Sequence, residues 1–250
     1  MSAEAHFAEH GWVLVPLLDD DGVEALRQWV DEVAAWPPSK GAWLQHHELT
    51  VHGPVLCRSE NFVPFHAGLR RLLTDGPMLA TASAMLGEPA VLYKEKINYK
   101  LPGGAGYAPH QDAPAYRFVE SHVSCMLAVD DATIANGCLE VVCDRHDELL
   151  PTDESGCIEA EVVAALDWMP VEVRAGEALW FHSRTPHRSG PNESSVPRRA
   201  LYPTYNARRE GDLRAAYYEQ KRVELAEQGS AGTGRVAVSL IGDFQGRPVD

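Results

Sequence analysis

Two histidines and one aspartate in this chain have the types and spacing of a metal site. His110 and Asp112 occur in the run GYAPHQDAPAY, and His187 follows in TPHRSG. Successive side chains of an extended strand alternate, so a His-x-Asp pair places both ligands on one face. A second histidine from a distant strand would complete two nitrogens and one carboxylate on one side of a metal. This arrangement is typical of non-heme Fe(II) oxygenases, because it leaves positions open for a co-substrate and dioxygen.

An arginine follows the second histidine at a spacing that suggests a role in binding a co-substrate. Arg198 lies eleven residues beyond His187. Its planar guanidinium can pair bidentately with a carboxylate. Metal ligands combined with a carboxylate-binding group indicate an oxygenase that uses 2-oxoglutarate as co-substrate.

The elements around these residues are strand-like. His110 and Asp112 lie in a Gly- and Pro-rich stretch, His187 follows ALWFHS, and Arg198 opens RRALYPTYN. All four residues therefore fall at strand ends or in adjoining loops. Many short strands separated by turn residues favour a sandwich or barrel. The predicted strands are 90–99, 107–117, 122–129, 138–142, 169–173, 177–182 and 199–206.

Helices flank this strand-rich region. The opening HFAEHGWVLVPLL predicts a short helix and a strand. Helical spacing of apolar residues predicts two further helices, over 20–36 and over 65–86, and the second is interrupted at Gly76-Pro77. A charged helix is expected over 210–228, and a last strand over 235–241. The 250 residues suit one domain, with a helical N-terminal region over 1–89, a strand-rich core over 90–206, and a C-terminal helix and tail over 207–250.

Composition restricts the partners. A formal net charge of −14 argues against nucleic acid and anionic membranes, and leaves a small-molecule substrate as the expected partner. The N-terminus lacks a signal-peptide pattern and no apolar run has membrane-spanning length, so we expect a cytoplasmic protein. The oligomeric state stays open, a homo-oligomer included. The five cysteines form no CxxC pair and are expected to be reduced thiols.

Four runs carry a resemblance to a known family: HQDAPAY at 110–116, NGCLEVVCDRH at 136–146, WFHSRTPHRSGPN at 180–192 and RRALYPTY at 198–205. Over residues 5 to 210 the chain resembles the phytanoyl-CoA dioxygenase family of Fe(II) and 2-oxoglutarate oxygenases. The resemblance implies an all-β core with flanking helices, folded as a double-stranded β-helix (jelly roll, cupin-like). It implies hydroxylation of an unactivated C–H, with release of succinate and CO2.

The same resemblance assigns the site residues. It implies that His110, Asp112 and His187 bind the iron and that Arg198 binds the distal carboxylate of 2-oxoglutarate. Arg199 is the competing assignment, since alternation lets only one of the two arginines face inward. The spacing from His187 favours Arg198. Because Asp112 is present where related halogenases have a small residue, the resemblance implies hydroxylation over halogenation.

A second group of residues could bind the substrate. The run YKEKINYKLPGG at 93–104 places Lys94, Lys96 and Asn98 on one strand face. This face is either a solvated strand edge or an anion pocket. Arg58, in LCRSENF, lies where relatives have a basic residue that contacts 2-oxoglutarate or substrate; a surface salt bridge is the alternative. Two tyrosines close to the His-x-Asp pair could line a pocket or stack on a cation, Tyr107 and Tyr116.

The segment YKEKINYKLPGGAGYAPHQDAPAY resembles the bacterial branch of the family that acts on aminoethylphosphonates and their N-methylated forms. The main rival is a natural-product tailoring hydroxylase of the same family. From a different class, a zinc hydrolase could use the same three ligands, although it leaves Arg198 unexplained. A non-catalytic binding protein is expected to have lost a ligand, and none is missing.

Overall fold

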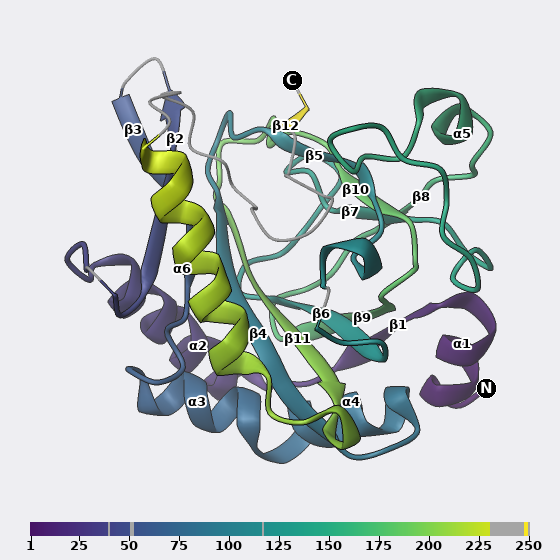
Figure 1. The fold of residues 1–250 in the computed structure, drawn as a ribbon, viewed down its shortest axis with the longest axis horizontal. Coiled ribbons are helices and arrows are strands. Elements are labelled where there is room, and N and C mark those ends of the chain that lie inside the picture. The colour runs from purple at the N-terminus through teal and green to yellow at the C-terminus, as the bar shows by residue number, and fades with distance from the viewer. Residues whose placement is uncertain (40, 51–52, 117, 231–247, 250) are drawn as a thin grey trace.

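The computed structural model describes residues 1–39, 41–50, 53–116, 118–230 and 248–249. Its centre consists of two antiparallel sheets that face each other (Figure 1). The seven-stranded sheet has the order β1-β9-β6-β11-β4-β3-β2, and the five-stranded sheet has the order β12-β5-β10-β7-β8. From β4 to β11 the chain passes back and forth between the two sheets. This is the double-stranded β-helix that the sequence predicts.

The strands of the larger sheet are β1 (Trp12–Pro16), β2 (Leu44–Thr50), β3 (Gly53–Glu60), β4 (Ala90–Lys100), β6 (His122–Ala128), β9 (Glu177–His182) and β11 (Arg198–Ala207). Those of the smaller sheet are β5 (Gly106–His110), β7 (Leu139–Val141), β8 (Met169–Val171), β10 (His187–Ser189) and β12 (Pro248–Val249). The predicted strand over 107–117 is wrong in its second half. The strand ends at His110, and a 3-10 turn occupies Ala113–Ala115, because Pro114 has no N–H to donate to a sheet.

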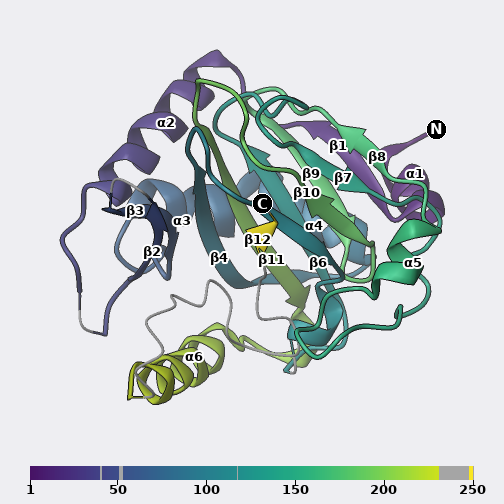
Figure 2. The ribbon, with the colours of Figure 1, turned by 90° about the horizontal axis from the view of Figure 1, so that it is seen from above.

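Three helices cover the outer face of the larger sheet (Figure 2). They are α2 (Asp20–Ala34), α3 (Ala67–Thr74) and α4 (Gly76–Leu86). The Asp19 carboxylate caps α2 by accepting from the Gly22 N–H at 2.9 Å. The helix predicted over 65–86 is divided at Gly76, whose φ of 59° is left-handed. Side chains from these helices and the sheet form the larger apolar core, including Leu26, Val30, Leu69, Leu73, Met78, Ile97, Trp180 and Leu201.

The N-terminal region is less helical than expected. Besides α1 (Ala3–His10), it contributes β1 to one edge of the larger sheet and β2 and β3 to the other. Strand β2 has the sequence LQHHELT and β3 has GPVLCRSE. Neither shows clean apolar alternation, because the polar residues of β3 face a polar interior. That is why the sequence pattern did not reveal these strands.

The remaining helices lie outside the sheets: α5 (Ala160–Ala164), the 3-10 turn Arg208–Glu210, and α6 (Arg214–Ser230). Figure 1 shows α6 running alongside β4 and β3. The strand expected over 235–241 lies outside the described residues. Within the described ranges, no helix combines the length and the apolar character that crossing a bilayer would require.

Between the two sheets, the interior is apolar at one side and polar at the other. The apolar side contains Met126, Ala128, Val141, Leu179, Phe181 and Ala200. All five cysteines are free thiols, and all but Cys143 are buried. The polar side is a cavity lined by most of the predicted site residues.

Candidate active site

His110, Asp112 and His187 converge between the sheets. One ligand atom from each lies within 4.8 Å of the others, and all three residues are buried. His110 ends β5 and His187 begins β10, where the two strands pair and place the residues opposite each other. Asp112 lies beyond the strand, with helical dihedral angles of φ −73° and ψ −29°. The turn after β5, and not strand alternation, therefore brings its carboxylate to the histidines.

Both histidine rings are oriented by backbone carbonyls. His110 Nδ1 lies 2.8 Å from the Ala108 carbonyl oxygen, and His187 Nδ1 lies 3.0 Å from that of Thr185. Each carbonyl accepts the Nδ1 hydrogen, so each ring presents Nε2 as its electron-pair donor, the usual arrangement for metal-binding histidines. Burial lowers the pKa of both imidazoles. Both are therefore held neutral, the form that binds metals.

The Asp112 carboxylate is held from two sides. Ser124 donates its hydroxyl to Oδ2 at 2.5 Å, and the Tyr116 hydroxyl lies 3.4 Å from Oδ1. Burial by itself raises the pKa of Asp112, but His187, Lys94 and Lys96 together outweigh it and hold the pKa below its usual range. The carboxylate is therefore held ionised, the form in which it could bind a metal.

Arg198 and Arg199 point to opposite faces of β11. Arg199 faces outward, where its Nε and Nη2 donate to Asp130 at 2.8 Å and its Nη1 donates to Asp31 at 2.5 Å. Arg198 is 1% exposed and faces the interior, with Nη1 4.0 Å from the Met126 sulfur. Its Nε finds no hydrogen-bond partner among the residues described. A buried guanidinium N–H without an acceptor is costly, and a bound carboxylate would supply that acceptor.

The polar cavity has a volume of about 630 Å³, a fraction of it open to solvent. It contains the three candidate ligands and the predicted basic residues, but Arg198 is not among its lining side chains. The lining residues are Arg58, Lys94, Lys96, Asn98, Tyr107, His110, Asp112, Ala115, Tyr116, Ser124, Leu139, Phe181, His187, Arg188, Tyr202 and Thr204.

The basic face of β4 is interior. Strand β4 pairs with β3 on one side and with β11 on the other, so it is not a sheet edge. Lys94 and Asn98 are each 5% exposed, and Arg58 on β3 is 2% exposed. The solvated-edge alternative for the lysines and the surface salt-bridge alternative for Arg58 are therefore wrong. A central strand exposes one face to the cavity, and its alternate residues line that cavity.

Aromatic rings accompany these cations. The Lys94 ammonium hydrogen-bonds the Tyr116 hydroxyl and lies 4.0 Å from the centre of that ring. Lys96 Nζ lies 5.2 Å from the centre of the Tyr202 ring. Burial lowers the pKa of Lys94 to about 8, whereas the charge of Asp112 opposes that shift. Contact with ring faces partly replaces the lost hydration of these ammonium groups.

Arg58 is fixed by two polar groups of the cavity. Its Nε donates to Asn98 Oδ1 at 3.0 Å, and its Nη2 donates to the Tyr107 hydroxyl at 3.3 Å. Arg58 thus joins Lys94, Lys96 and Asn98 in one basic wall, as the sequence suggested.

Two contacts in and behind the site were not predicted from the sequence. Ser124 contacts the Asp112 carboxylate, but a serine in the apolar run HVSCMLA gives no signal of such a role. Glu60 binds Lys221 from α6 through both carboxylate oxygens, across 161 positions of sequence. No local pattern could have revealed that pair.

Residues 7–200 match the phytanoyl-CoA dioxygenase (PhyH) family. The chain belongs to this family. It is 49% identical over 240 residues to a methylphosphonate hydroxylase of Gimesia maris, covering 95% of this chain and 92% of that protein. It is 36% identical over 225 residues to a 2-aminoethylphosphonate dioxygenase of an uncultured bacterium, covering 88% of this chain and 86% of that protein.

The fold agrees with that membership. The crystal structure of SnoN, a non-heme alpha-ketoglutarate-dependent epimerase from nogalamycin biosynthesis, superposes with a TM-score of 0.70 at 24% identity and covers 82% of each chain. The chain is thus a 2-oxoglutarate-dependent non-heme iron dioxygenase that uses Fe(II), 2-oxoglutarate and dioxygen. This conclusion leaves no basis for the zinc hydrolase or for a non-catalytic binding protein.

The residues present fit these cofactors. Two neutral imidazoles and one carboxylate on one side of a site match the ligand preference of non-heme Fe(II). A buried guanidinium with an unsatisfied N–H matches a carboxylate co-substrate.

Proposed function

We propose that this enzyme hydroxylates a C–H bond of a small alkylphosphonate, converting 2-oxoglutarate to succinate and CO2. The observation that carries this proposal is the basic wall formed by Arg58, Lys94, Lys96 and Asn98 beside the three candidate ligands. Phosphonates are compact anions, and clustered cations and amide donors in a water-poor cavity are suited to bind them. Two similar proteins are named for phosphonate substrates, which supports the same class here.

In this proposal His110, Asp112 and His187 bind the iron through His110 Nε2, an Asp112 oxygen and His187 Nε2. Bound iron with 2-oxoglutarate supplies dioxygen activation and the oxidising power for the C–H bond. Ser124 and Tyr116 keep the carboxylate oriented.

Arg198 binds the distal carboxylate of 2-oxoglutarate. Its Nε lacks an acceptor within the described residues, and its backbone position turns the guanidinium inward. Arg199 is committed to Asp130 and Asp31 on the outer face. Of the two functions open for Arg58, we assign it to the substrate, because it hydrogen-bonds Asn98 within the basic wall.

The charges of the cavity favour a substrate without an ammonium group. Asp112 is the only carboxylate among its described lining residues, and it is assigned to the metal. A substrate ammonium would meet only the rings of Tyr107, Tyr116 and Tyr202 beside the cations of the basic wall. Methylphosphonate therefore fits better than 2-aminoethylphosphonate or its N-trimethylated form. Of the four wall residues only Asn98 is neutral, so the wall matches a compact anion better than a larger, mostly neutral tailoring substrate.

The test is succinate formation by Fe(II)-loaded protein with 2-oxoglutarate and oxygen. The panel comprises methylphosphonate, ethylphosphonate, 2-aminoethylphosphonate, its N-trimethylated form and methanesulfonate. We expect the strongest stimulation with methylphosphonate and a hydroxymethylphosphonate product. Stimulation by 2-aminoethylphosphonate above methylphosphonate would contradict the charge argument but keep the phosphonate class. Stimulation by none of the phosphonates would refute the proposed substrate class.

A further inference from the structure

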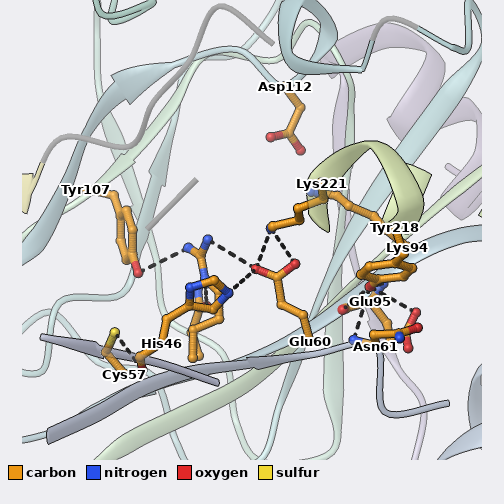
Figure 3. Close-up of polar contacts among 12 residues, drawn as sticks. His46, Cys57, Glu60, Asn61, Lys94, Glu95, Tyr107, Asp112, Tyr218 and Lys221 are labelled. Atoms are coloured by element: carbon orange, nitrogen blue, oxygen red, sulfur yellow. Dashed lines mark hydrogen bonds and ion pairs between the residues drawn. The ribbon is translucent and has the colours of Figure 1, made fainter. Parts of the chain in front are cut away.

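A buried ion pair lies behind the basic wall. Glu60, at the end of β3, is 1% exposed, and Lys221, in α6, is 2% exposed. Lys221 Nζ donates to the two Glu60 oxygens at 2.7 and 2.5 Å (Figure 3). Neither residue lines the cavity. Because the desolvation cost of a buried ion pair largely offsets its attraction, stabilisation alone does not account for it.

The Glu60 carboxylate also lies close to Arg58 of the basic wall. The two residues are two positions apart on β3, so their side chains share a face. Arg58 Nη1 is 3.7 Å from Glu60 Oε1, a longer contact than either of those that Lys221 makes. Arg58 instead makes its shorter contacts with Asn98 and Tyr107. Glu60 is thus placed between two cations and is bound mainly by one of them.

We propose that Lys221 is a positioning residue for substrate binding. By neutralising Glu60, it keeps the Arg58 guanidinium directed toward Asn98 and Tyr107, with its charge available to the phosphonate. Lys221 belongs to α6, so a helix outside the β-helix core contributes to the position of Arg58. The inference rests on the proposed function, in which Arg58 binds the substrate anion.

Loss of Lys221 would leave the Glu60 carboxylate buried without a counter-charge at short range. The nearby His46 Nε2 lies 3.4 Å from Glu60, but burial lowers the pKa of His46, so it offers a neutral ring. Among the described residues, Arg58 is then the cation that makes an ion-pair contact with Glu60, while Lys94 and Lys96 interact with this carboxylate through their charges without such a contact. A carboxylate and a guanidinium form a strong two-pronged pair, so Arg58 would turn toward Glu60 and away from the substrate.

A purely structural role for Lys221 would be to attach α6 to the core. The helix has a second ion pair, between the partly exposed Arg214 and the buried Glu95, that serves as a control. Arg214, in its first turn, donates through Nε to Glu95 at 2.9 Å and through Nη2 at 2.5 Å. Glu95 belongs to β4 but does not line the cavity. Removing Arg214 therefore weakens the attachment of α6 without releasing a carboxylate onto Arg58.

The experiment compares the wild type with K221M, K221R, R214M and the double variant E60Q/K221M. It measures KM and kcat for methylphosphonate, KM for 2-oxoglutarate, and anaerobic calorimetric binding of methylphosphonate to the Fe(II)–2-oxoglutarate enzyme. We expect K221M to raise the methylphosphonate KM and Kd about tenfold, as for loss of one desolvated charge contact. The KM for 2-oxoglutarate is expected to stay unchanged. The double variant should restore both methylphosphonate values, and K221R and R214M should resemble the wild type.

Several outcomes would overturn the inference. A double variant as weak as K221M would show that Glu60 does not capture Arg58, and an equal KM increase in R214M would show that helix attachment alone matters. If K221M does not fold, E60Q alone provides the test, since it removes the competing carboxylate and should bind methylphosphonate no more weakly than the wild type. If the wild type binds methylphosphonate and K221M binds it equally well, this inference alone would be refuted. A wild type that binds no phosphonate would refute the proposed substrate class as well.

Discussion

His110 and His187 face each other across neighbouring strands of the smaller sheet, with ring centroids 4.1 Å apart. Their Nδ1 atoms are both directed at a carbonyl oxygen two residues earlier in the chain. The two rings are therefore oriented by backbone carbonyls close to them in the chain, Ala108 within β5 and Thr185 in the turn before β10, without a bound metal. The turn at Asp112 brings the third candidate ligand to them.

Replacing His187 with alanine is expected to lower iron occupancy strongly and to abolish succinate formation, because it removes one of the two nitrogen ligands of the proposed site. The measurement is bound iron per chain by elemental analysis, together with succinate release. H47A is the matched control, since His47 on β2 is partly exposed and lies away from the cavity. Full iron occupancy in H187A would refute the ligand assignment.

The two adjacent arginines should respond differently to replacement. R198M is expected to raise the KM for 2-oxoglutarate by about a hundredfold, since truncating a buried charge partner costs about 2–5 kcal/mol. R199M should leave that KM unchanged and lower the melting temperature, because it breaks the contacts with Asp130 and Asp31. Steady-state kinetics and thermal denaturation of both variants test this. The reverse pattern would transfer the co-substrate function to Arg199.

K96M should weaken substrate binding selectively. Lys96 lines the cavity, and burial lowers its pKa, yet the phosphonate would restore its charge on binding. The methylphosphonate KM is expected to rise about tenfold or more, with KM for 2-oxoglutarate within about twofold of the wild-type value. An unchanged methylphosphonate KM would remove Lys96 from the binding site.

His122 should make the protein sensitive to acid. It is 2% exposed, neither ring nitrogen hydrogen-bonds within the described residues, and burial lowers its pKa to about 3. Between that value and the unfolded pKa of about 6.5, only the unfolded chain takes up the proton. The free energy of unfolding therefore falls as pH falls through this window, by at most about 1.4 kcal/mol per pH unit from this group.

H122F removes that proton uptake and should unfold at a lower pH than the wild type. Acid titration followed by circular dichroism measures the midpoint. Because the other buried histidines remain in the variant, the contribution of His122 is the difference between the acid midpoints of the wild type and H122F. An unchanged midpoint would show that His122 does not contribute to the acid transition.

The larger features of the fold were accessible from sequence because they depend on local periodicity. Helical spacing located α2 and the α3–α4 pair, and short apolar runs located strands β4, β6, β7, β8, β9 and β11 to within a few residues. Among the described strands, the sequence pattern missed β2, β3, β10 and β12. Strands β2 and β3 lack clean apolar alternation, and β10 and β12 have only three and two residues. Periodicity needs several repeats of a regular apolar pattern, so irregular or very short strands lack the signal.

The sequence by itself indicated the chemistry: the His-x-Asp pair, the distant His187 and the arginine pair mark a candidate metal site and a candidate group for a carboxylate co-substrate. Tertiary structure decided which arginine faces inward, since alternation permits either until Asp130 and Asp31 bind Arg199. It also decided that Lys94 and Lys96 line the cavity, because their surroundings depend on which strands flank β4 and not on its own residues. The contact between Glu60 and Lys221 was likewise decided only by the tertiary structure. Residues far apart in sequence meet only when the whole chain has folded.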